Sequence, residues 1–121
     1  MNRREKKKPR RVEKMTVYLL LRDGTVALRK RVENGLLAGL WEFPNVPGAV
    51  DEESAAAPLS DWGLTAREWK RELSAKHIFT HVEWHLRGIY LRCRQEVRFQ
   101  WFTEAEIQQQ IGLPTAYRQF L

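Results

Sequence analysis

The sequence predicts an α+β fold in which a mixed or antiparallel sheet is flanked by short helices. Two observations lead to this prediction. An Asp-Gly turn joins two strand-like segments early in the chain, and two long segments with few breakers follow in its second half. The chain has 121 residues, 43% of them hydrophobic, which suffices for one modest core. We therefore expect one folded domain, and we place it at residues 15–121.

Residues 1–14 are expected to form a disordered or extended basic tail or interdomain linker. They lack apolar periodicity, and they hold eight basic and two acidic side chains. The folded part then begins near Met15. Residues 16–22 and 25–30 predict a β-hairpin, because Asp23-Gly24 supplies the positive φ angles of a two-residue type I′ turn. This turn is the strongest local structural signal in the sequence.

The middle of the chain predicts a loop, a short strand and a short helix. Residues 35–39 form a flexible apolar loop, and residues 40–43 alternate toward Pro44, which ends the strand. Residues 51–57 start with three acidic side chains and continue with helix formers. We expect a helix there that stops before Pro58.

The second half of the chain predicts a second hairpin followed by two short helices. Residues 69–80 and 82–93 are two long strands that separate near His81. Residues 97–102 are a further strand, and Thr103 caps a helix that runs through Gln110. A final short helix, introduced by residues 113–115, ends at the C-terminus.

The net charge of +6 lies entirely in the tail, since the remaining residues hold 13 basic and 13 acidic side chains. Any DNA contact of the folded part must therefore come from locally sorted charge or from base recognition. The tail is expected either to add non-specific phosphate contact or to act only as a solvated linker. The side chains considered for phosphate contact are Lys6, Lys7, Lys8, Arg10 and Arg11.

Cysteine content and apolar runs limit the class of protein. The single cysteine, Cys93, excludes an internal disulfide and any all-cysteine metal or iron–sulfur site built from this chain alone. The apolar runs are too short to cross a bilayer, and no signal-peptide core follows the basic N-terminus. We expect a monomer in the cytoplasm, associated with the nucleoid if bacterial, with no membrane partner.

Three stretches of the sequence carry a family resemblance. The first comprises Leu-Arg-Lys-Arg at residues 28–31 and Gly-Leu-Leu-Ala-Gly-Leu-Trp-Glu-Phe-Pro at residues 35–44. The second is His-Ile-Phe-Thr-His at residues 77–81, and the third is the closing segment at residues 113–121. Together they resemble the C-terminal, Nudix-like domain of MutY-type adenine DNA glycosylases. The resemblance extends from about residue 15 to the C-terminus.

The sequence departs from the Nudix hydrolases, which share this fold, at the Nudix box G-x5-E-x7-R-E-U-x-E-E-x-G-U. The helix of that box presents carboxylates to a metal that bridges a diphosphate. With the last Gly of the box aligned to Gly63, residues 56–61 retain one of three carboxylates. Pro58 is expected to interrupt the helix, and the spacing from Gly48 is too short for the box. A substitute magnesium site at Asp51, Glu52 and Glu53 is less favoured than an acidic first helical turn.

The resemblance implies a role in recognising a DNA lesion. A MutY-type enzyme excises adenine opposite 8-oxoguanine in an N-terminal domain that carries an iron–sulfur cluster. Such a catalytic domain is absent from this sequence, so we expect a non-catalytic chain without a cofactor of its own. The implied partners are duplex DNA containing 8-oxoguanine opposite adenine, the N-terminal catalytic domain of the same protein, and a sliding clamp or another repair protein.

The resemblance assigns specific roles to the residues around 77–81. The family usually has Ser where Thr80 stands, and the Thr80 hydroxyl would accept a hydrogen bond from the N7–H of 8-oxoguanine. Phe79 would stack or wedge beside the lesion. An equal alternative is that Phe79 is an ordinary strand residue that faces the core. His77 and His81 would contact phosphate or order the tip, or be structural imidazoles. The five tryptophans are expected in packing rather than in a stacking platform for single strands.

Two other functions stay open from the sequence. One is a small Nudix-type diphosphohydrolase with a degenerate box. The other is an interaction module whose basic tail and sheet edge bind a clamp or repair partner without touching a lesion.

Overall fold

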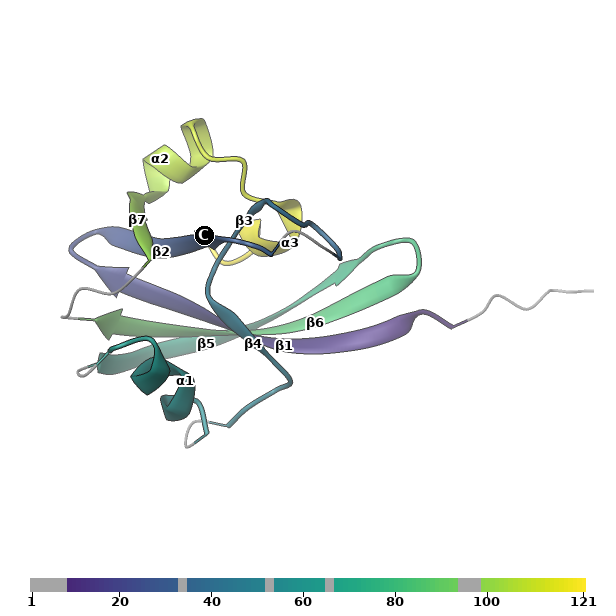
Figure 1. Cartoon of the computed structure of the whole chain (residues 1–121), viewed down its shortest axis with the longest axis horizontal. Coiled ribbons are helices and arrows are strands. Elements are labelled where there is room, and N and C mark those ends of the chain that lie inside the picture. Colours follow the sequence, from purple (N-terminus) through teal and green to yellow (C-terminus); the bar gives the residue numbers. More distant parts are fainter. Residues whose placement is uncertain (1–8, 33–34, 52–53, 65–66, 94–98) are drawn as a thin grey trace, which may run out of the picture.

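A mixed seven-stranded sheet is the centre of the computed structural model, which describes residues 9–32, 35–51, 54–64, 67–93 and 99–121 (Figure 1). Five strands follow the order β3-β2-β1-β6-β5, while β4 pairs with β1 and β7 pairs with β2. The pairing of β1 with β6 is parallel and the other pairings are antiparallel. The predicted fold class is therefore confirmed. The strands are β1 (Arg11–Arg22), β2 (Thr25–Lys30), β3 (Trp41–Glu42), β4 (Asn45–Pro47), β5 (Arg67–Ile78), β6 (Val82–Cys93) and β7 (Gln100–Thr103).

Short helices lie on both faces of this sheet (Figure 1). They are α1 (Ala56–Asp61) on one face, and α2 (Glu104–Gln109) and α3 (Thr115–Arg118) on the other. The Thr103 side chain accepts from the backbone N–H of Glu106 at 3.1 Å, and the Glu106 carboxylate accepts from the backbone N–H of Thr103 at 2.8 Å. This reciprocal capping box explains why α2 starts where the sequence predicts it.

Both predicted hairpins are confirmed. Arg22 pairs with Thr25 across the first turn, and Asp23 and Gly24 have φ angles of 50° and 79°. Those positive angles are what a type I′ turn requires. In the second hairpin β5 pairs with β6 up to Ile78 and Glu83, which leaves residues 79–81 near the tip.

The predicted start of the fold near Met15 is wrong by four residues. β1 already begins at Arg11, and Arg11–Lys14 pair in parallel with Val82–His85 of β6. The backbone N–H of Arg11 also donates to the carbonyl of His81 at 3.1 Å. Composition suggested a tail here, but the open edge of β6 offers backbone partners whatever the charge of the side chains. The N-terminal segment is therefore joined to the second hairpin.

The predicted helix at residues 51–57 is also wrong. α1 spans Ala56–Asp61 and includes Pro58 in its first turn, so this proline does not interrupt it. Proline is tolerated there because the first N–H groups of a helix have no partner within the helix. Before it, the Asp51 carboxylate accepts from the backbone N–H of Ser54 at 2.7 Å. Glu52 and Glu53 lie outside the described residues.

Two buried clusters lie on opposite faces of the sheet. The larger one packs β1 and β6 against the segment before α3 and α3 itself, and it contains Phe43, Trp84, Tyr117 and Phe120. The smaller one holds α1 against the other face through Leu59 and Tyr18. The Tyr18 hydroxyl donates to the carbonyl of Ala55 at 2.9 Å, and burial raises its pKa to about 12.

The five tryptophans all contribute to packing, as expected. Trp84 is fully buried, and the other four are partly buried and pack against one of the two clusters. The latter are Trp41, Trp62, Trp69 and Trp101. In the part of the chain that the structure describes, no helix is both long and apolar enough to cross a membrane.

Candidate nucleic-acid interface

The connection between β5 and β6 projects from one end of the sheet and carries the residues that the sequence singled out (Figure 1). The backbone N–H of Phe79 donates to the carbonyl of Val82 at 2.7 Å, so only Thr80 and His81 form the apex. Both of these side chains are exposed. Neither is among the described residues with a positive φ, so the apex differs from the Asp23-Gly24 turn.

Phe79 and His77 lie at the base of the apex and pack on the core. The Phe79 ring is partly buried and contacts the ring of Trp84 edge-on, with centroids 5.0 Å apart. The centroid of the His77 ring lies 4.8 Å from that of Phe79. His77 pairs with Trp84 across the two strands. Because Trp84 is fully buried, this stack fixes the base of the hairpin tip.

Thr80 and His81 instead face solvent. Within the described ranges, no side chain or backbone group forms a hydrogen bond with the Thr80 hydroxyl. The carbonyl of His81 accepts from Arg11, which anchors the apex to β1 while the imidazole stays outside. The structure therefore brings His77 and Phe79 together and leaves Thr80 and His81 available to an external partner.

The basic residues of the N-terminal segment are split by the structure. Arg10 and Arg11 are exposed and lie at the same end of the molecule as the hairpin tip (Figure 1). Arg11 belongs to β1, and its guanidinium pairs with Glu13 at 2.9 Å. Lys6, Lys7 and Lys8 lie outside the described residues.

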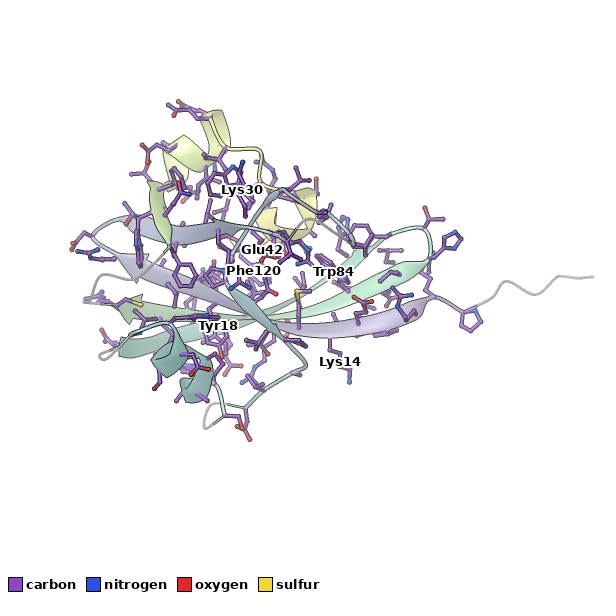
Figure 2. All side chains as sticks on the ribbon, viewed as in Figure 1. Lys14, Tyr18, Lys30, Glu42, Trp84 and Phe120 are labelled. Atoms are coloured by element: carbon purple, nitrogen blue, oxygen red, sulfur yellow. The ribbon has the colours of Figure 1, made fainter. Side chains whose placement is uncertain are left out.

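A charged cluster that the sequence did not indicate surrounds Glu42, which is labelled in Figure 2. The Glu42 side chain is 5% exposed and accepts from Arg29 Nε at 2.9 Å and from Arg31 Nη1 at 2.7 Å. The Tyr117 hydroxyl lies 3.3 Å from the same carboxylate. Arg29 and Arg31 are two positions apart on an extended segment and so share one side. This spacing of two arginines is the sequence feature that could have indicated the cluster.

This cluster ties β2 and β3 to α3, which covers the larger core. The Arg31 guanidinium also lies 5.1 Å from the centre of the Trp84 ring, so the cluster supports the same tryptophan that holds Phe79. Burial, followed by the charge of Glu42, raises the pKa of Tyr117 well above its ordinary value. The Tyr117 hydroxyl therefore stays protonated. The arrangement is that of a structural network behind the hairpin tip.

The region that would correspond to the Nudix box holds few carboxylates. In α1 the only acidic residue is Asp61, and it is exposed. Hydrogen bonds from the backbone and side chain of Ser54 lower the pKa of Asp51. Among the residues that the structure describes, no group of three or more His, Cys, Asp or Glu side chains could hold a metal ion.

Three solved structures illustrate the fold that this chain shares. The C-terminal domain of mouse MUTYH, crystallised in complex with human PCNA, has a TM-score of 0.68 and 23% identity, with 88% of this chain and 83% of that chain covered. The MutT protein of Methanosarcina mazei Go1 has a TM-score of 0.74 and 18% identity, covering 94% and 93%. The ORF135 protein of E. coli has a TM-score of 0.62 and 21% identity, covering 88% and 84%.

At these identities the structures establish the shared fold. A family model described as the NUDIX domain matches residues 16–121, which is nearly the whole described chain. The match includes the hairpin tip, the Glu42 cluster and α1. The chain therefore belongs to the NUDIX domain family.

Proposed function

We propose that this chain is the lesion-recognition domain of a MutY-type adenine DNA glycosylase and that it distinguishes 8-oxoguanine from guanine opposite adenine. The observation that carries the proposal is the exposed Thr80 hydroxyl at the apex of a hairpin whose base is fixed in the core. Recognition of a base edge requires a polar group that can reach the base and a rigid element that holds this group in position. The hairpin tip has both properties.

The chemistry of the lesion suits a hydroxyl and a backbone amide. Guanine presents N7 as a hydrogen-bond acceptor in the major groove. Oxidation at carbon 8 turns N7 into an N–H donor and adds a carbonyl acceptor beside it. Thr80 Oγ1 can accept from the new N–H, while a backbone N–H of the apex donates to the new carbonyl. Unmodified guanine would leave these groups unmatched, at a cost of about 1–3 kcal/mol.

Phe79 supplies the apolar part of this interface. Its ring contacts both His77 and Trp84 and is only partly buried, so it would support the apex and present apolar surface beside the lesion. Apolar side chains in this position lower the cost of unstacking where DNA is bent. His81 contributes an exposed imidazole that can donate to a phosphate.

The proposal extends to the partners of the parent protein. The catalytic domain with its iron–sulfur cluster would precede this chain, and the basic residues before β1 would lie between the two. The mouse MUTYH domain of the same fold was crystallised with PCNA, which supports a sliding clamp as a further partner. Mobility-shift titration of the purified chain against its cognate clamp would test that part separately from DNA binding.

The lesion-reading role is tested by Thr80→Ala and Thr80→Ser in the purified chain. Affinities are measured by fluorescence anisotropy for two matched duplexes, one with 8-oxoguanine opposite adenine and one with guanine opposite adenine. Thr80→Ala is expected to reduce the preference for the oxidised duplex about tenfold, equivalent to roughly 1–2 kcal/mol, because a hydrogen bond to the N7–H is lost. Thr80→Ser keeps the hydroxyl and is expected to be nearly neutral.

The melting temperature of each variant serves as the control, because a distorted hairpin would also lose discrimination. A folded Thr80→Ala variant with the full preference of the wild type would show that the hydroxyl is not the reader. A wild-type chain that binds both duplexes equally would refute the lesion-recognition role as a whole.

A further inference from the structure

The sheet face opposite Trp84 carries a row of basic side chains close to the hairpin tip. Lys14 of β1 pairs with His85 of β6, and His85 pairs with Lys76 of β5. Residues paired across neighbouring strands point to the same side of a sheet. Lys14, His85 and Lys76 therefore form one row across three strands. Figure 2 shows Lys14 projecting from the face opposite Trp84.

This part of the face is hollow and open. A cavity of about 510 Å³ is lined by Lys14, Lys76 and His85, together with Ser74 and Arg87 from the next row. Among the described helices, only α1 lies on this side, and it packs on the other half of the face through Leu59. The row is consequently accessible: Lys14 is exposed, and the side chains of Lys76 and His85 are 58% and 39% exposed.

The row itself has more basic than acidic side chains. Glu83 pairs with His85 at 2.7 Å and with Lys76 at 3.5 Å, and Glu72 pairs with Arg87 at 2.7 Å. The hydrogen bond from His85, followed by the charge of Lys76, lowers the pKa of Glu83. In the row itself, Lys14 and Lys76 thus face one carboxylate, that of Glu83, whereas Arg87 in the next row interacts with both Glu72 and Asp51. Within the described part of the chain, Lys14 has no carboxylate partner.

We propose that the Lys14–His85–Lys76 row is a phosphodiester-binding site for the DNA strand that the hairpin tip reads; this inference rests on the proposed function. Lys76 precedes Thr80 by four residues, which corresponds to about 13 Å at the rise of a β-strand. The same distance covers about four nucleotides at the axial rise of one strand in duplex DNA. The tip would read one base while the row holds a backbone phosphate about three to four nucleotides away.

The surroundings favour DNA as the occupant over an acidic protein. Ile78 follows Lys76 by two positions on β5 and leads to the apex, and exposed Arg10 lies at the same end of the molecule. A ligand that spans the tip, the row and Arg10 meets basic side chains at separate points, which favours a ligand with repeated negative charge. A nucleic-acid backbone has this property, and its phosphates accept from ammonium, imidazole and hydroxyl donors such as Ser74.

The test compares Lys14→Gln, Lys76→Gln and the double variant with Lys30→Gln. Lys30 is an exposed lysine that ends β2 and is distant from the row (Figure 2). The dissociation constant for an undamaged duplex is measured over a range of salt concentrations. Each phosphate contact contributes about 0.9 to the slope of log K against log salt, so the double variant should lose about 1.8 and Lys30→Gln almost nothing. A Lys14→Arg/Lys76→Arg variant should keep the slope.

A second readout locates the phosphate. Neutral methylphosphonates placed three or four nucleotides from 8-oxoguanine should weaken binding of the wild type but leave the double glutamine variant unaffected. An unchanged salt slope in the double variant, or a loss equal to that of Lys30→Gln, would overturn the proposal. Binding of poly-glutamate by the row, without any change in the DNA slope, would assign it to an acidic protein instead and would also overturn it.

The measurements distinguish a wrong phosphate-site proposal from a wrong proposal of 8-oxoguanine recognition. The lysine variants should retain the preference for 8-oxoguanine, whereas Thr80→Ala should lose the preference and keep the salt slope. If the wild type shows no lesion preference but the slope still depends on Lys14 and Lys76, the phosphate site stands and the proposed function does not.

Discussion

Gly88 lies in the middle of β6, where a glycine weakens a strand unless a close neighbour requires it. That neighbour is Phe120: a Cβ built on Gly88 would lie 2.4 Å from Phe120 Cε1 and 3.3 Å from the carbonyl of Leu73. The carbonyl of Phe120 also accepts from the Tyr90 hydroxyl at 2.7 Å, which holds the ring in place. The missing side chain at position 88 therefore allows the C-terminal segment to pack on the sheet.

Gly88→Ala is expected to destabilise the chain by about 1–3 kcal/mol, because the ring of Phe120 must shift in a packed core. Urea unfolding followed by tryptophan fluorescence measures the change. Gly112→Ala is the matched control, since a Cβ there would meet nothing within 4 Å. Equal free energies of unfolding for the two variants would show that Phe120 can shift without destabilising the fold.

The position of the hairpin tip could be predicted from the sequence, whereas the network behind it left only the spacing of its two arginines as a signal. The resemblance over residues 77–81 identifies the segment that carries Phe79 and Thr80, and the structure places it at the hairpin tip. Glu42 is 11 and 13 positions from its two arginine partners, and their meeting depends on β3 pairing with β2. A sequence pattern reports local periodicity, whereas such a pairing follows from tertiary packing.

At the scale of elements, β1 shows why the boundary of the fold was misplaced. The pattern in residues 16–22 is apolar and predicts a strand, whereas Arg11–Lys14 is charged and resembles a tail. Met15 pairs with Leu86, and β6 extends from Leu86 back to Val82 at the hairpin tip. The backbone of this part of β6 is available for pairing, so Arg11–Lys14 extend β1. The two β-hairpins were predictable since their signals are local. The pairing of β1 with β6 joins distant parts of the chain and was not.

Removal of residues 1–10 and removal of residues 1–14 are therefore expected to differ. The shorter truncation should lower the salt slope of DNA binding and keep the melting temperature, because it takes away basic side chains that precede β1. The longer truncation should also lower the melting temperature, since β6 loses backbone partners at the tip. Differential scanning calorimetry and anisotropy titrations measure the two effects. Equal melting temperatures would mean that Arg11–Lys14 add no stability.

At the scale of the whole molecule, the chain combines the Nudix fold with an α1 that presents one carboxylate. Diphosphate hydrolysis in this fold relies on several carboxylates that hold a divalent metal on a helix. Fold alone does not establish the reaction, because the chemistry depends on the side chains placed on it. In the described part of the molecule, α1 thus lacks the set of carboxylates that such a hydrolase uses.

We expect the purified chain to release no phosphate from 8-oxo-dGTP in magnesium and to excise no adenine from an 8-oxoguanine duplex. A malachite green assay with added pyrophosphatase and a gel assay for strand cleavage after alkali measure the two activities. Hydrolysis that disappears in Glu52→Gln or Glu53→Gln would contradict this expectation and assign a metal site to residues 51–53.

The parallel pairing of β1 with β6 has a consequence for synthesis of the chain. Arg11 and its partner Val82 are 71 positions apart in the sequence. At about 5–20 residues per second, a ribosome needs roughly 4–14 seconds to deliver β6 after β1 has emerged. During this interval β2 and β4 can pair with one edge of β1, while the edge meant for β6 stays open beside the apolar run Val17–Leu21. An open apolar edge can pair with another chain, so nascent-chain aggregation should be most sensitive to substitutions in that run.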